Sequence, residues 1–418
     1  MRNRLQQWYY SLMEVPGASH IAMWCAPAVK NIAERLASKS THSLRTRIEN
    51  LEKQAISTRL ELNEIRARDS EFAKHCPSFS IIINTCNRRP FLEKAIESAW
   101  RQYYPSFEII CVNGPSTDGT HALLEAWKDR IKICHCPERN LSRSRNIGIA
   151  AAGGDLIAFM DDDAIAPQDW LMELVRGYSE ASVGAVGGYV RDRTDVNWQA
   201  QVSVADRYGD VRHYPTVGAA VESEGDPEDW RTKKFFSPMG TNVSFRRSAL
   251  NHVGGFDENY AYHLDETDVV LRLVDAGLDV RFQGSAEVTH KSAASELRRE
   301  DRTPRSFYHQ ARSKTYFILR HAAPVFGRNA ADKHISAYLA WLASLAKTAF
   351  RQGRLARADV ERLQQELVDG RKAGEILASQ GPKLAHFAEN RPSRGNASPY
   401  VPGSFPRAET TPLLGQPV

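Results

Sequence analysis

Residues 156–163 constrain the fold and the chemistry of this chain more than any other stretch. The apolar run at 156–160 predicts a buried strand, and it ends abruptly in Asp161, Asp162 and Asp163. Neighbouring anions repel one another and lose hydration at the edge of a sheet, so a neutralising divalent cation is the simplest physical reason for this cluster. The alternative is a solvated turn, which is what most runs of aspartate are. Taken alone, the stretch leaves both interpretations open.

Two stretches upstream of the acidic run also have strand character. Residues 80–85 and 107–112 are mostly apolar, and each is followed by turn residues and then by a helical pattern. This alternation predicts an α/β domain with a parallel sheet. Because acid or amide residues end the three strands, we expect a ligand crevice along one edge of an open sheet.

Composition excludes several classes of protein. The 418 residues include 55 basic and 50 acidic side chains, and a net charge of +5 is too small and too dispersed to predict nucleic acid as a partner. Six cysteines in this length do not form a disulfide framework and fit a reducing cytosol. No stretch approaches the ~20 consecutive apolar residues of a membrane span. We therefore expect a cytoplasmic protein, soluble or peripheral at the inner face of the cell membrane.

Shifts in composition divide the chain into five expected segments. They are an amphipathic or irregular start, a helical segment, the α/β domain, a helical extension and a disordered tail, at 1–43, 44–76, 77–300, 301–382 and 383–418. Apolar residues alternate three and four apart over 44–66, which indicates either a surface helix or a coiled coil that joins two copies of the chain. Residues 195–235 form an irregular charged and aromatic insertion, which is typical of a functional or mobile segment. Basic residues flank an apolar run within 334–357, as in helices that lie on anionic lipid, although packing against the core fits equally well.

Seven short motifs follow one another in order along the α/β segment. They are SIIINTCNRRP at 80–90, STDGT at 116–120, RNIG at 145–148, FMDDD at 159–163, GTNVSFRR at 240–247, VGGFDE at 253–258 and DETDVVLRL at 265–273. Each motif is weak alone. Together, and in this order, they resemble the signatures of the family 2 glycosyltransferases over about half of the chain.

The resemblance implies a GT-A fold, which is a Rossmann-like, mostly parallel central sheet flanked by helices, here with an N-terminal helical or coiled-coil segment and a C-terminal helical extension. It also implies a nucleotide-diphospho-sugar donor and a metal-dependent inverting transfer to a hydroxyl of a glycan or lipid-linked acceptor, in cell-surface polysaccharide synthesis. Residue chemistry supports this independently, because the charge that grows on a departing diphosphate needs a metal and fixed cations. We expect Mn²⁺ or Mg²⁺ with Asp163 as principal ligand and Asp161 assisting, through the metal or the ribose. His290 matches the family's late histidine and is either a further ligand or a structural residue.

The same resemblance assigns the donor pocket. Its expected residues are Thr85, Asn87, Arg88, Asn113, Arg143, Arg145, Asp161 and Asp162. Guanidinium groups suit phosphate oxygens, so by family position at least Arg145 is expected to face the donor. Asn113 departs from the family pattern, which usually has an aspartate there that accepts a hydrogen bond from N3–H of uracil or thymine. The identity of the base is therefore left open.

The family places its catalytic base in an acidic pair that opens a helix, and Asp265-Glu266 matches that pair. By alignment the second acid, Glu266, is the base. Family members commonly have aspartate there, so the longer glutamate has to be accommodated. Acids are also favoured at a helix start by the macrodipole, and both explanations can hold together. By the same resemblance, Gly240 and Asn242 contact the acceptor or donor sugar.

Two other functions compete with this interpretation. A sugar nucleotidyltransferase also holds a nucleotide and a metal on a similar sheet, but it does not need the acidic helix at 265–273. A non-catalytic scaffold that recruits a membrane glycan-assembly complex is favoured by the departure at Asn113. The retained carboxylates argue against the scaffold, because a site without chemistry has no need for clustered charge. A Rossmann dehydrogenase is set aside because the turn at 85–89 lacks the required glycines.

Overall fold

The structure of the chain is a computed structural model that describes residues 39–67, 69–195, 197–230, 233–293, 299, 305–387 and 392. The chain divides into two compact units, Met1–Ile65 and Arg66–Val418. In the first, α3 (Lys39–Ala67) is the helix that the spacing predicts over 44–66. Pairing of two copies through this helix stays a prediction. The amphipathic piece expected near the start of the chain lies outside the described residues.

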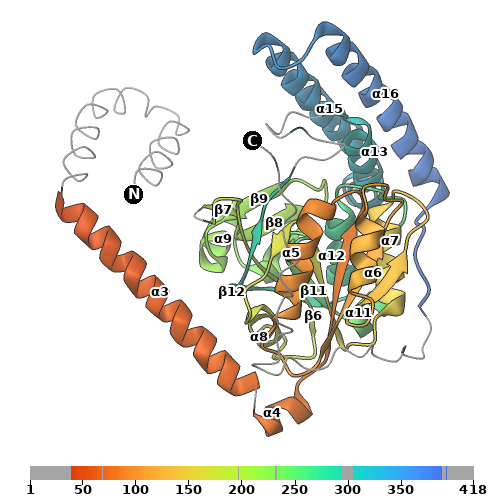
Figure 1. The fold of residues 1–418 in the computed structure, drawn as a ribbon. Helices are drawn as coiled ribbons and strands as arrows, with labels where there is room; N and C mark the ends of the chain where they lie inside the picture. Colours follow the sequence, from red (N-terminus) through yellow and green to blue (C-terminus); the bar gives the residue numbers. More distant parts are fainter. Residues whose placement is uncertain are drawn as a thin grey trace, which may run out of the picture. The chain divides into compact units, whose positions relative to one another are not determined.

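The second unit is built on one large sheet (Figure 1). Its nine strands are β1 (Phe79–Thr85), β2 (Phe107–Asn113), β3 (Lys132–His135), β4 (Leu156–Asp161), β5 (Ala164–Ile165), β6 (Val183–Arg191), β7 (Trp198–Ala200), β11 (Val243–Arg246) and β12 (Asp279–His290). The order across the sheet is β3-β2-β1-β4-β11-β6-β12-β5, with β7 paired to β6. Strands β1 to β4 are mutually parallel, β6 is parallel to β12, and β11 runs antiparallel between β4 and β6. The predicted mostly parallel sheet is confirmed.

Helices cover both faces of this sheet because its central strands are apolar on both sides. Ile81 and Ile83 of β1 pack into one core, and Ile82 between them packs into the other. The first core is closed by α5 (Arg89–Trp100), α6 (Thr120–Ala126) and α8 (Trp170–Arg176). The second is closed by α7 (Leu141–Ala151), α11 (Arg247–Val253) and α12 (Asp265–Asp275). Continuous apolar strands are what a sheet covered on both faces requires. A short helix, α4 (Ser70–His75), precedes β1.

The insertion at 195–235 is more regular than its sequence suggests. It contains β7 and a separate three-stranded antiparallel sheet of β8 (Val202–Asp206), β9 (Val211–Tyr214) and β10 (Lys234–Phe236), with α9 (Val217–Glu224) and α10 (Pro227–Trp230). Val202 and Val204 are buried and form a small core with Ala220. Alternation of apolar and polar residues over five positions is too short a signal to stand out among the surrounding charges.

The C-terminal extension is helical and packs on the second core. Its helices are α13 (Tyr308–Phe317), a π-helix (Ile318–Ala322), α14 (Ala323–Phe326), α15 (Arg328–Arg351) and α16 (Arg357–Gln380). Gly370 and Gly374 let α16 approach α13 closely, since a Cβ at either position would lie 2.5–2.7 Å from backbone oxygens of α13. No helix in the described part of the chain is long and apolar enough to span a bilayer.

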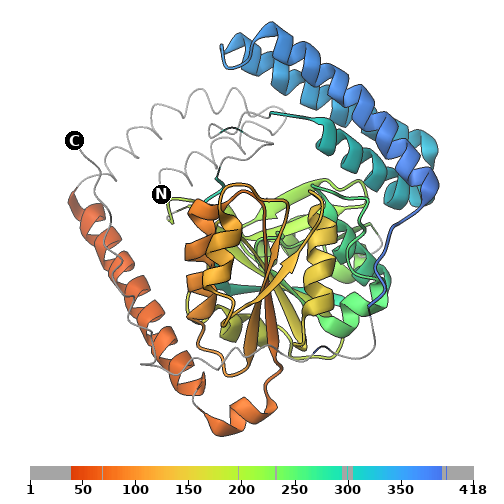
Figure 2. The same ribbon diagram turned by 45° about the vertical axis from the view of Figure 1, so that its right-hand side comes forward.

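The segment after α16 returns to the domain, as Figure 2 shows. Its backbone exchanges hydrogen bonds with the turn after α11, from Ala385 N–H to Gly254 O and from Glu258 N–H to Lys383 O, both 3.0 Å. The side chain of Phe387 packs there as well, beside Gly255. The tail expected to be disordered from residue 383 is therefore ordered as far as 387. Apart from residue 392, the rest of it lies outside the described residues.

Candidate active site

A cavity of about 500 Å³ opens where β1 and β4 end. Parallel strands bring their carboxyl ends to the same edge, and the pairing of Asn84 with Asp161 places the ends of β1 and β4 side by side. Loops from β11, α12 and the insertion complete the wall. The acidic run and the acidic pair both line this one cavity.

Arg88 compensates two of the three clustered carboxylates. It follows β1, and its guanidinium group lies 3.3 Å from Asp162 Oδ1 and 2.5 Å from Asp163 Oδ2. Asp162 and Asp163 are buried, whereas the Asp161 side chain is 39% exposed. Burying adjacent anions is unfavourable unless they are paired, so Arg88 makes the cluster tolerable in the folded chain. Asp161 is left facing the cavity.

His290 closes the other side of the cluster. The last residues of β12 pair with β5, with His290 opposite Ala164, and this register brings the imidazole beside the acidic run. Its Nε2 lies 3.1 Å from Asp163 Oδ1 and 3.6 Å from Asp161 Oδ2. Its Nδ1 lies 3.0 Å from Gln199 Oε1. A ring that donates from Nδ1 to this amide presents Nε2 as a ligand atom.

The pKa values of the two buried carboxyl groups are shifted in opposite directions. Burial opposes ionisation of Asp163, but a hydrogen bond and charge from His290, the charge of Arg88 and the Ala293 N–H outweigh it and lower its pKa to about 2. Burial dominates at Asp162 and raises its pKa to about 7, with Arg88 offsetting part of the effect. Asp163 is thus a permanent anion at the cavity edge.

The donor set at this edge fits a divalent cation. Asp161, Asp163 and His290 each offer one ligand atom, and these atoms lie within 4.8 Å of one another. Two carboxylates and one imidazole form a mixed oxygen and nitrogen set that suits Mn²⁺ and, less closely, Mg²⁺. Among the described residues, this is the group of acidic, histidine or cysteine side chains that meets this distance criterion.

Arg145 and the acidic pair line the same cavity. Arg145 is buried on α7, lies 5.0 Å from the ring centre of Phe256 and forms an ion pair with Asp265 at the start of α12. Glu266 lies 3.9 Å from the same guanidinium group and keeps 26% of its side chain exposed. Burial and the neighbouring Asp265 raise the pKa of Glu266 to about 8. Asp265 is therefore committed to Arg145, and Glu266 is the carboxylate that can exchange a proton near neutral pH.

Gly240 leaves room for the guanidinium group of Arg145. A Cβ at this position would lie 2.6 Å from a terminal nitrogen of Arg145, whereas its 3.4 Å distance to Cδ of Glu266 would be an ordinary contact. A side chain there would displace Arg145, which pairs with the acidic pair.

The loop before α12 carries backbone strain at this point. His263 and Leu264 are consecutive non-glycine residues in the left-handed region, with φ of 73° and 66°. Such strain is held in place only where the surroundings enforce it, and it is concentrated at functional sites. Burial lowers the pKa of His263 to about 4, so its ring lines the cavity as a neutral group.

The predicted site residues divide into two groups. Those that line the cavity are Thr85, Arg88, Arg145, Asp161, Asp162, Asp163, Gly240, Asp265, Glu266 and His290. The others lie outside the lining and have local partners. Asn87 accepts from Thr117 N–H at 2.7 Å, and Asn113 accepts from the Ser116 hydroxyl at 2.7 Å.

Arg143 and Asn242 also lie outside the lining. Arg143 pairs on the surface with Glu138 at 2.8 Å. Asn242 is buried in the sheet, where it accepts from Trp170 Nε1 at 2.8 Å and donates to two backbone carbonyls. Asn242 therefore holds neighbouring elements of the sheet together. A contact of Asn242 with sugar stays a prediction.

Several polar side chains in the cavity lining were not expected from the sequence, and three of them come from β7, the strained loop and α13. They are Gln199, His263 and His309, respectively. His263 lies three residues before Glu266, so its place next to the acidic pair was a usable signal. Gln199 and His309 reach the cavity only through long-range packing, which leaves no local pattern.

An open α/β sheet that gathers an acidic cluster, an imidazole and two guanidinium groups at its carboxyl edge is typical of domains that bind phosphorylated ligands together with a cation. Residues 80–254 match the family model described as glycosyl transferase family 2. The chain carries a domain of glycosyl transferase family 2.

Curated relatives share this region. The chain is 29% identical over 56% of its length to the O-antigen biosynthesis protein RfbC of Myxococcus xanthus, where the match covers 18% of the relative. It is 27% identical over 51% of its length to the glucosyl-dolichyl phosphate glucuronosyltransferase of Haloferax volcanii, covering 68% of that protein. Among solved structures, the mannosyltransferase PcManGT of Pyrobaculum calidifontis, in complex with GDP-Man and Mn²⁺, superposes with a TM-score of 0.43 at 16% identity, covering 72% of this chain and 88% of that one.

The cluster geometry predicts which substitutions weaken cation binding. Asp163→Asn replaces a charged ligand by a neutral amide and His290→Gln removes the imidazole ligand, so we expect Mn²⁺ to bind at least about tenfold more weakly to either variant. Asp162→Asn is the matched control, because that carboxylate pairs with Arg88 and is outside the ligand group. Titration of Mn²⁺ followed by electron paramagnetic resonance measures the affinity. Equal affinity for the parent and the Asp163→Asn variant would contradict the site.

Proposed function

We propose that this chain is a metal-dependent, inverting glycosyltransferase that moves a sugar from a nucleotide-diphospho-sugar donor to a hydroxyl of an acceptor. One observation supports this above the others: a single cavity holds both the candidate cation ligands and an acidic pair in which Glu266 keeps 26% of its side chain exposed. Sugar transfer needs both, because a leaving diphosphate has to be stabilised while an alcohol is deprotonated.

The residues divide the work between two groups in the cavity. In one group, Asp161, Asp163 and His290 would hold the metal ion, which when bound neutralises charge on the departing diphosphate. Arg88 keeps two carboxylates of the cluster compensated and in position. In the other group, Arg145 is buried among anions, which raise its pKa despite the burial, so it remains a fixed cation in the cavity wall.

Glu266 would act as the general base. Its carboxylate accepts the proton of the acceptor hydroxyl while that oxygen bonds to the anomeric carbon from the face opposite the leaving group. The bond from the anomeric carbon to the diphosphate oxygen breaks, and the nucleoside diphosphate leaves with the electron pair. Displacement from the opposite face inverts the configuration at the anomeric carbon. Asp265 would orient Arg145 and the start of α12.

The acceptor is a glycan or a lipid-linked sugar in cell-surface polysaccharide synthesis under this proposal. Support comes from the names of the relatives, one an O-antigen biosynthesis protein and another a glucuronosyltransferase named for a glucosyl-dolichyl phosphate. The donor's base and sugar stay open, since Asn113 lies outside the cavity lining and departs from the family pattern.

A sugar nucleotidyltransferase is less well supported. It needs the cation site, but it has no use for Glu266 in the same cavity. A non-catalytic scaffold needs neither group. Hydrolysis or transfer from a sugar nucleotide in the presence of Mn²⁺ distinguishes the enzyme from the scaffold.

The role of Glu266 predicts a specific loss of activity. Glu266→Gln removes the base with little change in shape, so kcat should fall by about 10²–10⁴-fold, the usual contribution of a general base. Glu266→Asp keeps a carboxylate and is expected to retain measurable turnover. Because the raised pKa keeps Glu266 protonated below about 8, kcat/KM of the parent should rise as pH increases through that range. Turnover by Glu266→Gln within a few fold of the parent would contradict the assignment.

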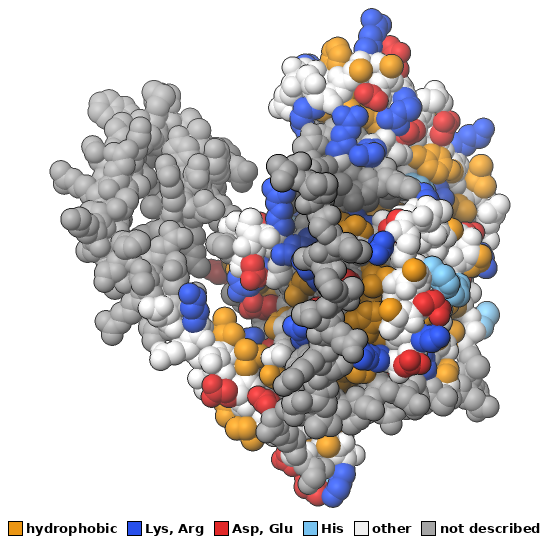
Figure 3. Space-filling view, viewed as in Figure 1, with side chains coloured by type: hydrophobic (Ala, Val, Ile, Leu, Met, Phe, Trp, Pro, Cys, Tyr) orange, Lys and Arg blue, Asp and Glu red, His pale blue; other side chains and the backbone are white. Residues whose placement is uncertain are grey.

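We also propose that the end of the helix pair α15–α16 binds the surface of an anionic membrane. Trp341 and Leu345 are 52% and 37% exposed one turn apart on α15, and Phe350 is 47% exposed near its end. Exposed cations at Lys347, Arg351, Arg354 and Arg357 follow the apolar positions, with no acid before Asp359. Figure 3 shows Lys and Arg side chains gathered with apolar ones over this end of the molecule. Apolar side chains flanked by cations match a headgroup layer of anionic lipid.

Membrane binding is testable with charge reversal. Arg351→Glu combined with Arg354→Glu should weaken binding to vesicles that contain phosphatidylserine by more than about tenfold, because each basic residue near such a surface contributes about 1 kcal/mol. Lys128→Glu with Arg130→Glu makes the same change on another exposed surface and should leave binding unchanged. Co-sedimentation at low salt measures the bound fraction. A parent protein that stays in the supernatant with these vesicles would overturn the proposal.

A further inference from the structure

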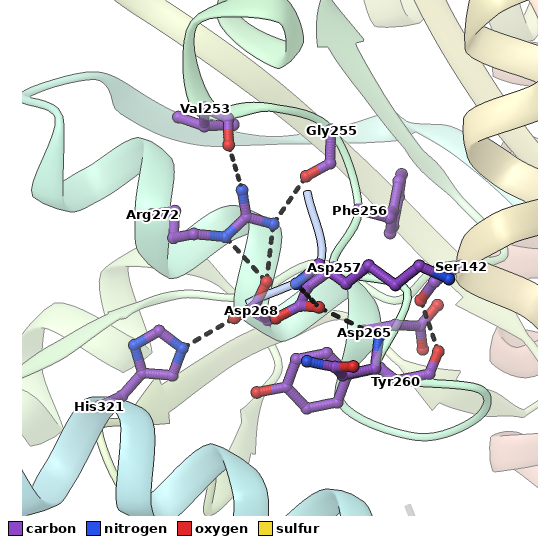
Figure 4. A network of polar contacts seen from close by, with 12 residues as sticks. Ser142, Val253, Gly255, Phe256, Asp257, Tyr260, Asp265, Asp268, Arg272 and His321 are labelled. Carbon is purple, nitrogen blue, oxygen red and sulfur yellow. Dashed lines mark hydrogen bonds and ion pairs between the residues drawn. The ribbon is translucent and has the colours of Figure 1, made fainter. Parts of the chain in front are cut away.

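Asp268 is a buried acid of the catalytic helix that does not reach the cavity. It lies on the first turns of α12, two residues after Glu266, and is 2% exposed. Its carboxylate accepts from Arg272 Nε at 2.8 Å on one side and lies 2.8 Å from His321 Nε2 on the other. Figure 4 shows both partners converging on it. Burial opposes its ionisation, but Arg272 and His321 outweigh that and lower its pKa to about 2.

Arg272 connects this carboxylate to the turn that precedes the acidic pair. The same guanidinium group donates to Val253 O at 2.5 Å and to Gly255 O at 2.7 Å (Figure 4). That turn runs through two glycines in the left-handed region. Arg272 lies on α12 itself, four residues after Asp268. The helix carrying Glu266 is therefore clamped to the glycine turn through Arg272, and Asp268 holds that guanidinium group in place.

His321 connects the same carboxylate to a different part of the chain. It belongs to the π-helix between α13 and α14, is 7% exposed, and packs against the ring of Phe317 at 4.7 Å. A π turn holds an extra residue and changes the direction in which the following side chains point, and such turns are concentrated at functional sites. Here the turn aims an imidazole from the C-terminal extension at the catalytic helix.

The extension is held firmly enough to position that imidazole. Gly370 and Gly374 seat α16 directly on the backbone of α13, which leads into the π-helix. From the middle of α13, Ser313 donates to Tyr262 O at 2.8 Å, in the strained loop before α12. Tyr316 donates to Asp257 Oδ2 at 2.6 Å. The extension thus contacts the loop, the glycine turn and the helix that surround Glu266.

We propose that His321 is a positioning residue of the active site, through which the C-terminal helical extension fixes the first turns of α12 and hence the carboxylate of Glu266. The inference rests on the proposed function. Its physical basis is that a catalytic group displaced by about 1 Å can lose on the order of 10²-fold in rate, even when the change lies away from the reacting atoms.

The test compares two substitutions that differ only in reach. His321→Gln keeps a nitrogen donor near the place of Nε2, whereas His321→Asn is shorter and loses contact with Asp268. We expect kcat of His321→Asn to fall by about 10–10²-fold with donor KM little changed, and His321→Gln to recover most of the loss. The assay uses the full chain with Mn²⁺ and the sugar nucleotide that the parent turns over.

A second histidine of the extension provides the matched control. His334 Nε2 lies 2.8 Å from Asp210 Oδ2, in the insertion and not on α12. His334→Asn therefore breaks an equivalent contact without touching the catalytic helix, and kcat should stay near that of the parent. Equal losses in His321→Asn and His334→Asn would mean general loosening of the extension and would overturn the proposal. So would a His321→Asn variant with the parent's kcat.

Hydrogen exchange gives a readout that does not depend on activity. Backbone amides of residues 265–272 should exchange faster in His321→Asn than in the parent, His321→Gln or His334→Asn. Unchanged exchange in His321→Asn would overturn the positioning role. If the parent turns over no sugar nucleotide but the exchange pattern is as expected, the proposed function is contradicted. The contact of His321 with α12 would still be shown to hold the start of that helix.

Discussion

The charge balance at the end of β4 is the constraint on which the rest of the site depends. Three consecutive carboxylates are held there, and two of them are buried. Arg88 compensates Asp162 and Asp163 from one side, and His290 faces Asp161 and Asp163 from the other. Adjacent anions cannot be buried without such partners. The arrangement leaves one edge, made of two carboxylates and an imidazole, that can take a cation without rebuilding the fold.

Sheet order brings these groups together from distant parts of the sequence. Pairing of β1 with β4 carries Arg88 to the acidic run, and pairing of β12 with β5 carries His290 to it. The acidic pair comes from the start of α12, which packs into the second core. That helix is tied to the glycine turn through Arg272 and to the C-terminal extension through Asp268. Elements of the domain core therefore form the cavity, and contacts from the C-terminal extension hold α12 in place beside it.

Much of this could be predicted from the sequence, and the failures have a common physical cause. Strand ends predicted the sheet and the acidic run, and the resemblance to ordered family motifs singled out Arg88, His290 and Glu266, which all line the cavity. Asn87, Asn113, Arg143 and Asn242 lie outside the cavity lining, since a motif position fixes the backbone place of a residue but not the direction of its side chain. Gln199, His309 and His321 had no local signal at all. They reach the site through packing of the insertion and the extension, and such contacts depend on three-dimensional geometry that no spacing in the sequence records.

Anomalous diffraction from a crystal of the parent protein grown with Mn²⁺ tests the cation site most directly. We expect a manganese peak at the carboxyl end of β4, within bonding distance of oxygen atoms of Asp161 and Asp163 and of Nε2 of His290. A manganese peak elsewhere in the cavity, or none at saturating Mn²⁺, would contradict this expectation.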